Sequence, residues 1–150
     1  PNGAIMYTIQ RIVGEDILLN YKSIKTELEK ALEYSDGERS AAQIILNSVS
    51  QPQIYQIWQV YKDGKGIALG STRVVQYEGF VALHIITLAG DTDGDLTEWS
   101  AMFEQEMKDQ PIDMLEFTGR RGFVKQLEKA GWTERYTTMR KLIKEKANGE

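Results

Sequence analysis

The stretch Phe80-Val81-Ala82-Leu83-His84-Ile85-Ile86-Thr87-Leu88 decides the fold, because almost every side chain in it is apolar. A strand covered on both faces reads as a continuous apolar run, whereas a strand covered on one face alternates. We therefore expect a central strand here. Leu96 to Gln110 follows with helical spacing, and Ile112 to Phe117 reads as another strand. This order predicts two parallel neighbouring strands joined by a right-handed helical crossover.

The segments on either side of this unit extend the sheet. Two more apolar runs precede Phe80, and Asp63-Gly64-Lys65 and Glu78-Gly79 separate the runs as hairpin-type turns, so the three predict an antiparallel meander. Spacing, caps and breakers predict the remaining elements, which are a strand from 5 to 14, helices at 15–33, 38–48 and 120–130, meander strands at 53–62 and 66–76, and a last strand at 132–143.

Composition excludes several chemistries. The chain has 150 residues, 41% of them apolar, and we expect one domain over 1–150, with Pro1 to Ile5 before Met6 open to interpretation as an expression remnant. Because it has no cysteine and one histidine, disulfides, thiolate catalysis, iron–sulfur clusters and multi-histidine metal sites are excluded. Asp91, Asp93 and Asp95 have the opening spacing of a calcium loop, but Leu96 and Met102 stand where glycine and glutamate are needed, so no metal is expected.

Charge is distributed unevenly along the chain. The net charge is −4, but residues 91–116 hold nine acidic and one basic residue (−8), and residues 119–146 hold nine basic and three acidic (+6). Two solvated faces explain this, and so does a docking surface for a protein partner or a second copy, with Trp99, Phe123 and Trp132 as its apolar centre. We expect no nucleic-acid partner, and the apolar runs are too short for a membrane span. The absence of a signal-peptide pattern predicts a cytoplasmic location.

The predicted order of elements resembles that of the GNAT superfamily of acyl-CoA-dependent N-acyltransferases. The segment from Lys125 to Trp132, KQLEKAGW, is similar to the family's closing helix-to-strand signature. The resemblance implies an α/β (α+β) fold, with a mixed, mostly antiparallel central sheet flanked by four helices. It also implies acetyl-CoA as the cofactor of an active member.

A narrower resemblance is to small GNAT-like proteins of tailed bacteriophages, some of which are virion components. Three short motifs carry it, namely Leu88-Ala89-Gly90, the acidic turn from Asp91 to Trp99, and Gly119-Arg120-Arg121-Gly122-Phe123. This likeness implies a location in the host-cell cytoplasm or in the virion.

The GNAT resemblance implies an acyl-CoA site between the fourth and fifth strands. The implied cofactor-binding residues are Leu88, Gly90, Gly94, Asp95, Thr118 and Arg120. The chain departs from the family in the loop from Ala89 to Asp95, where three carboxylates and no cation would repel a pyrophosphate. Leu127 stands at the position of the tyrosine that many members use as a general acid, and Arg120 at that of a family asparagine.

Two side chains are candidates for acid–base chemistry. Histidine is the side chain whose unperturbed pKa lies near neutral pH, and His84 lies on the strand that borders the implied acyl site, so it could deprotonate an amine. A hydrogen-bonded core histidine is the alternative. Tyr136, on the expected last strand, is the remaining candidate acid, or else a packed edge aromatic. Arg120 and Arg121 suit either a ligand phosphate or a carboxylate partner such as Glu116.

Two main functions remain open from the sequence, besides that of an unrelated α/β binding module. The departures favour a phage-type GNAT-fold protein with a degenerate acyl-CoA site that serves as a binding or virion-associated protein. The alternative is an acetyl-CoA-dependent N-acetyltransferase acting on an unknown amine. Whether the chain is an enzyme therefore depends on how its own residues are placed around the fourth strand.

Overall fold

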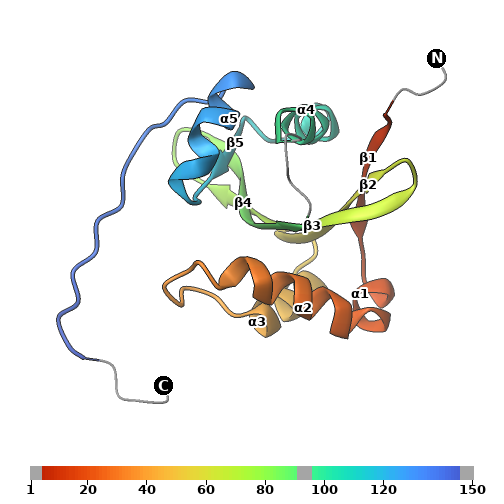
Figure 1. The fold of residues 1–150 in the computed structure, drawn as a ribbon, viewed down its shortest axis with the longest axis horizontal. Coiled ribbons are helices and arrows are strands. Elements are labelled where there is room, and N and C mark those ends of the chain that lie inside the picture. Colours follow the sequence, from red (N-terminus) through yellow and green to blue (C-terminus); the bar gives the residue numbers. More distant parts are fainter. Residues whose placement is uncertain (1–4, 91–95, 146–150) are drawn as a thin grey trace.

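The computed structural model describes residues 5–90 and 96–145 (Figure 1). Its strands are β1 (Tyr7–Ile12), β2 (Tyr55–Lys62), β3 (Lys65–Gln76), β4 (Val81–Gly90) and β5 (Met114–Phe117). Its helices are α1 (Glu15–Leu19), α2 (Tyr21–Leu32), α3 (Ala41–Ser50), α4 (Leu96–Met107) and α5 (Val124–Lys129), the last preceded by the short 3-10 helix η1 (Arg121–Phe123).

The strands form one sheet in the order β1-β2-β3-β4-β5. All neighbours are antiparallel except β4 and β5, which are parallel. The mixed, mostly antiparallel sheet is therefore confirmed, and so is the parallel pair joined through α4. β4 lies between β3 and β5, as its apolar sequence predicts.

Helices cover both faces of the sheet, with α1, α2 and α3 on one side and α4 and α5 on the other (Figure 1). The stripe of α2 predicted from three- and four-residue spacing buries Ile24 and Leu28 against Ile57 and Leu69 of the sheet. On the opposite face, Trp99 and Phe103 of α4 are 1% and 3% exposed and fill the second layer of the core. The sheet is thus the shared wall of two apolar layers.

The first helix differs from its prediction. A single helix over 15–33 was expected, but the chain breaks at Asn20, whose backbone is not helical, into α1 and α2. The Asn20 amide donates to the carbonyl of Asp16 (2.8 Å), and Ser23 Oγ donates to the carbonyl of Asn20 (3.1 Å). Asparagine competes for backbone groups in this way, which explains the break.

The predicted last strand is wrong. Residues 132–145 follow α5 as an extended segment without strand pairing in the described part of the chain. Trp132 anchors its start, because the indole Nε1 donates to Ser100 Oγ of α4 (2.6 Å). The apolar side chains beyond are exposed: Tyr136 89%, Met139 90%, Leu142 70% and Ile143 92%. Within the described residues of one copy, these alternating apolar side chains therefore pack against no face of the sheet.

The described residues also bear on membrane and metal sites. Among the helices over 5–90 and 96–145, none is long and apolar enough to cross a membrane. The same part of the chain brings together no group of three or more acidic or histidine side chains that could hold a metal ion.

Candidate functional site

A bulge divides β4. Thr72 of β3 pairs with Ile85, but the next residue back, Ser71, pairs with Thr87, so Ile86 is an extra residue on β4. Ile86 packs on the α2–α3 layer while Leu88 packs on the α4 layer, although both are even-numbered. The bulge has shifted the side-chain alternation by one residue, as bulges do, and it bends the strand at this point.

β4 and β5 pair only before the bulge. Their register runs from Ala82 with Met114 to Ile85 with Phe117, after which β5 ends. Beyond the bulge, residues 87–90 of β4 pair with β3. The side of β4 that faces β5 is thus opened just where the strand bends.

A small apolar cavity of about 20 Å³ lies at this opening. Its walls come from the ends of β4 and β5, from α4 and α5, and from the start of the C-terminal segment; they are Ile85, Leu88, Leu96, Trp99, Ser100, Phe103, Phe117, Leu127 and Trp132. A cavity of this size holds about one water molecule. No residue of η1 or α5 is buried. Moving the α5 wall of the cavity to admit a larger group would therefore disrupt less buried packing than moving α4.

A polar cluster lies on β4 and β5 just before the bulge. His84 and Glu116 are direct cross-strand partners, and His84 Nδ1 is 2.9 Å from Glu116 Oε1. The same oxygen accepts a hydrogen bond from the hydroxyl of Tyr77 (2.8 Å), which follows β3. The His84 side chain is 18% exposed and that of Glu116 30%. The histidine is therefore partly shielded and held from one side, yet open to a small molecule.

The contact with Glu116 sets the chemistry of His84. A carboxylate only accepts hydrogen bonds, so Nδ1 is the donor in this contact. When the imidazole is neutral, Nε2 then carries the lone pair of a base. His84 lies two residues before the bulge, about 7 Å along the strand. The hydrogen bond to Glu116 also raises the pKa of the Tyr77 hydroxyl, because ionised tyrosine would place a second negative charge beside the carboxylate.

The predicted cofactor-binding residues are only partly brought together. Leu88 lines the small apolar cavity, whereas Gly90, Thr118 and Arg120 are not among the described residues that line it. Gly90 ends β4 at φ 136°, and a Cβ there would overlap the carbonyl of Ile67 and lie 2.6 Å from the Cα of Ala68, so its conformation and its tight packing both require glycine. Gly94 and Asp95 lie outside the described residues.

Arg120 has a different partner from the one expected. Its guanidinium carbon lies 3.7 Å from the centre of the Tyr34 ring and 5.6 Å from that of Phe123. Glu116 is instead bound to His84 and Tyr77, and the nearby Arg121 lies 3.7 Å from Glu134. Thr118 and Arg120 are exposed, so Arg120 stacks on an aromatic ring while its edge remains accessible to an anion.

Two other expectations meet corrections. Tyr136 was expected on a strand but lies in the extended C-terminal segment, where it is exposed. The interpretation of Tyr136 as a packed edge aromatic is therefore wrong, while its role as an acid stays a prediction. Trp99 was also a candidate for the apolar centre of a docking surface, but it is 1% exposed, which fits the simpler interpretation of a core aromatic. Phe123 and Trp132 are half-buried.

The sequence missed Glu116 and Tyr77 as partners of His84. Glu116 stands in the middle of a short strand, where a carboxylate is unusual, and this was the available signal. The register that places it opposite His84 depends on the whole crossover through α4, which no local pattern encodes. Tyr77 lies in the turn between β3 and β4, so its reach depends on that turn.

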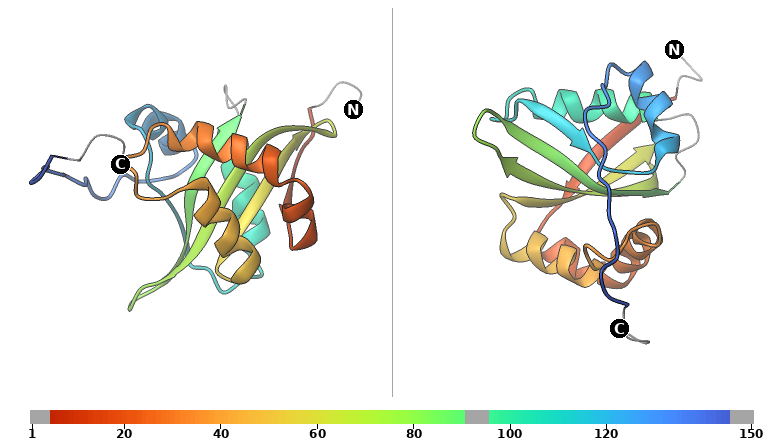
Figure 2. Two further views of the ribbon diagram at one scale, coloured as in Figure 1. Left: turned by 90° about the horizontal axis from the view of Figure 1, so that it is seen from below. Right: turned by 90° about the vertical axis from the view of Figure 1, so that its left-hand side faces the viewer.

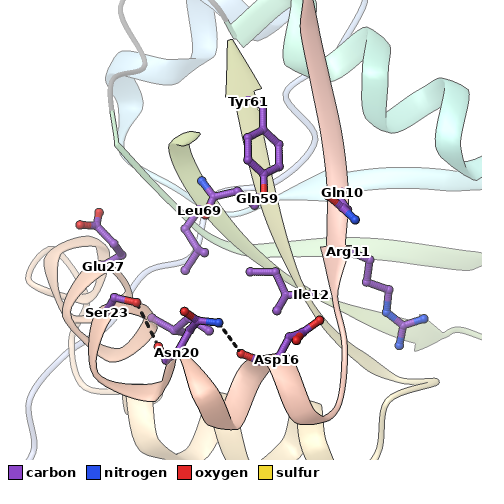
Figure 3. A pocket seen from close by; sticks show the side chains of 11 residues that line it. Gln10, Arg11, Ile12, Asp16, Asn20, Ser23, Glu27, Gln59, Tyr61 and Leu69 are labelled. Atoms are coloured by element: carbon purple, nitrogen blue, oxygen red, sulfur yellow. Dashed lines mark hydrogen bonds between the residues drawn. The ribbon is translucent and has the colours of Figure 1, made fainter. Parts of the chain in front are cut away.

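A larger cavity of about 330 Å³ lies elsewhere, between β1, β2 and the helices α1 and α2 (Figure 3). Its lining includes the carboxylates of Asp16 and Glu27 together with Gln59 and Tyr61 of β2. Leu69 is its lining residue on β3. His84 is not among its lining residues.

Comparisons with known proteins bear on this arrangement. No family model and no curated protein sequence matches the chain. Solved structures do match: glucosamine-6-phosphate N-acetyltransferase from Arabidopsis thaliana is 16% identical, with 93% of this chain and 99% of that chain covered and a TM-score of 0.61. An aminoglycoside acetyltransferase from an uncultured soil metagenomic sample, in complex with sisomicin, is 13% identical over 92% and 97%, with a TM-score of 0.63.

A third structure carries the family's name. It is a GNAT family acetyltransferase from Staphylococcus aureus, 10% identical over 91% of this chain and 98% of that chain, with a TM-score of 0.61. The chain has the GNAT acetyltransferase fold. The match spans more than nine-tenths of the chain, so the predicted GNAT-like α+β class is confirmed. The likeness to phage proteins stays a prediction from the three motifs.

Proposed function

We propose that this GNAT-fold chain is an acyl-CoA-dependent N-acyltransferase in which His84 is the general base. The observation that carries the proposal is the His84–Glu116 pair, an imidazole held at Nδ1 by a carboxylate two residues before the point where β4 and β5 separate. The named acetyltransferases of the same fold support the reaction class by analogy.

The proposed reaction is a direct transfer. The nitrogen lone pair of the acceptor attacks the thioester carbonyl, a C–N bond forms, and the C–S bond breaks. His84 Nε2 takes the proton that the amine loses, and Glu116 stabilises the resulting imidazolium. A thiol with a pKa of about 8.5 leaves readily as a thiolate, so Leu127 at the position of a family acid does not prevent turnover; the imidazolium or water returns the proton.

In this proposal, the acyl donor and the acceptor amine approach from opposite faces of the sheet. His84 shares the α2–α3 face with Ile86, and the apolar cavity lies on the α4–α5 face. The acyl chain would enter from the cavity side, where α5 has no buried residue to hold it in place. The acceptor amine would approach His84 from the other face, and the opened strand pair joins the two.

A second candidate function is the noncatalytic binding protein that the sequence favours. The three carboxylates in the stretch 91–95 and Leu127 support it, since they weaken the binding of a pyrophosphate and remove an acid. Such a protein would keep the GNAT scaffold as a partner-binding or virion-associated module. It needs no base, so the state of His84 separates the two candidates.

Release of free CoA thiol from acetyl-CoA tests the proposal directly. Glucosamine 6-phosphate and sisomicin are suitable first acceptors, because proteins of this fold are named for or bound to them. Acceptor-dependent thiol release that His84→Gln abolishes supports the enzyme. Acetyl-CoA that neither binds nor reacts, with the fold intact, supports the binding protein.

A further inference from the structure

A second charged side chain lies beside His84 on the sheet. Arg73 of β3 is the direct cross-strand partner of His84 on one side, as Glu116 of β5 is on the other. Directly opposed residues of paired strands share a face, so the three side chains form a row across β3, β4 and β5. Val74 and Leu83, the next opposed pair, pack on the α4 layer, which places the row on the α2–α3 face. The acceptor amine would approach from this face.

The guanidinium of Arg73 has no partner for its charge in the described part of the chain. Within 5–90 and 96–145 its side chain makes no hydrogen bond and no ion pair, and its Nε atom is buried without an acceptor. Glu116, the carboxylate in the row, is bound by His84 and by the hydroxyl of Tyr77, both at the same oxygen. A partly buried cation with unsatisfied donors favours an anion, which a ligand could supply.

The charge of Arg73 reaches the polar cluster around His84. The hydrogen bond to Glu116 raises the pKa of the Tyr77 hydroxyl, and the positive charge of Arg73 acts on the same hydroxyl in the opposite sense. Opposed residues of neighbouring strands lie about 5 Å apart. An anion bound to Arg73 and an amine at Nε2 of His84 could therefore belong to one small molecule.

Arg73 lies far from the position expected for the CoA pyrophosphate. The GNAT resemblance implies that the pyrophosphate binds at the loop that follows Gly90. His84, opposite Arg73, precedes Gly90 by six residues, or about 20 Å along β4. Arg73 and His84 are close instead to the turn between β3 and β4, and this end of the hairpin extends beyond α2 and α3 (Figure 2, left). The free cation is therefore placed to serve the acceptor rather than the cofactor.

We propose that the acceptor of this chain is an amine that also carries a carboxylate or phosphate group, and that Arg73 binds this anionic group while His84 receives the amine. The inference rests on the proposed function, which places the amine at Nε2 of His84. A guanidinium offers parallel donors to a carboxylate or phosphate, so Arg73 orients such an acceptor as well as attracting it. Tyr55 of β2 opposes Arg73 on the same face and can add a hydroxyl donor. A polyamine such as sisomicin would instead be repelled.

Acceptor pairs that differ in the anion test the role of Arg73. Glucosamine 6-phosphate is compared with glucosamine, and β-alanine with β-alaninamide, by release of CoA thiol. Arg73→Gln should lower kcat/KM about 10- to 100-fold for an anionic acceptor, as expected for the loss of a hydrogen bond between charged groups, and leave that of the neutral member nearly unchanged. Arg73→Lys should restore part of the loss, because it keeps the charge without the planar fork.

Two controls accompany these variants. Arg135→Gln, at an exposed position of the C-terminal segment, is the matched control and should leave the kcat/KM of every acceptor unchanged. Thermal unfolding checks that Arg73→Gln is folded, which we expect because the Arg73 side chain has no hydrogen bond to lose in the described chain. If Arg73→Gln did not fold, Arg73→Lys and the neutral acceptors would carry the same comparison.

Binding at His84 separates this inference from the proposed function. His84 is the one histidine of the chain, so its ring gives one set of NMR signals. Titration of wild type with glucosamine 6-phosphate or β-alanine should shift these signals at about 10- to 100-fold lower concentration than in Arg73→Gln. Such shifts without thiol release would support the anion site and contradict the proposed function. Turnover that depends neither on the anion nor on Arg73 would overturn the inference and leave the function standing. No response of His84 to either anionic amine would also overturn the inference.

Discussion

The two halves of β4 differ in what lies beside them. Before the bulge at Ile86, the strand has neighbours on both sides, and the rigid ladder fixes His84 opposite Glu116. After the bulge, it keeps β3 alone among its described partners and turns Leu88 towards a small apolar cavity. One extra residue thus separates a rigid half suited to holding a base from an open half suited to admitting a ligand.

The largest effect is expected in the rigid half. His84→Gln keeps a hydrogen-bond donor for Glu116 but removes the base, so kcat should fall about 10²- to 10⁴-fold. Steady-state thiol release with an active acceptor measures this. Glu78→Gln, on the exposed turn before β4, is the matched control and should leave kcat unchanged. Equal rates for wild type and His84→Gln would remove His84 from the mechanism.

The open half should depend on α4 for its stability. Trp99 packs against this end of β4 and is 1% exposed, so Trp99→Ala should lower the free energy of unfolding by about 3–5 kcal/mol. Met114→Ala, at the exposed start of β5, should cost far less. Urea denaturation compares the two. Similar losses would show that α4 does not support the open half.

The end of β4 should tolerate no side chain. Gly90→Ala places a Cβ against the backbone of Ile67 and Ala68 at a φ of 136°, and backbone strain of this kind costs about 1–3 kcal/mol. Gly79→Ala has open space around its Cβ and should change stability by less than about 0.5 kcal/mol. Thermal unfolding of both variants, run side by side, provides the check; a neutral Gly90→Ala would contradict the close packing.

The smallest effect concerns Tyr77. Its pKa is raised by the hydrogen bond to Glu116, so Glu116→Gln should bring it back down towards about 10. A raised folded-state pKa stabilises the protein below the unfolded pKa and loses that stabilisation as the pH rises through the folded value. Stability should therefore fall above about pH 10 more in wild type than in Glu116→Gln. Carbon-13 NMR of the tyrosine rings, assigned with Tyr77→Phe, follows the titration, and an unshifted Tyr77 in wild type would contradict it.

The sequence predicted the parts of the fold that local patterns encode. The apolar run of β4, the meander turns and the crossover to β5 were all legible from spacing and breakers. The strand expected after Trp132 was wrong because alternation shows a segment's capacity to pair but not whether an edge is in reach. The candidate site was half predicted: His84 stood out as the one histidine, whereas Glu116 became its partner only through the register of two strands separated by α4.

Binding of acetyl-CoA tests the central claim most directly, namely that the open half of β4 admits an acyl-CoA beside a fixed base. Calorimetric titration of the wild-type chain should give saturable binding at one site per chain. The carboxylates at 91, 93 and 95 should keep the Kd above the low micromolar range, yet below about 1 mM, as for a working substrate. A folded protein that takes up no acetyl-CoA at about 1 mM would contradict the account.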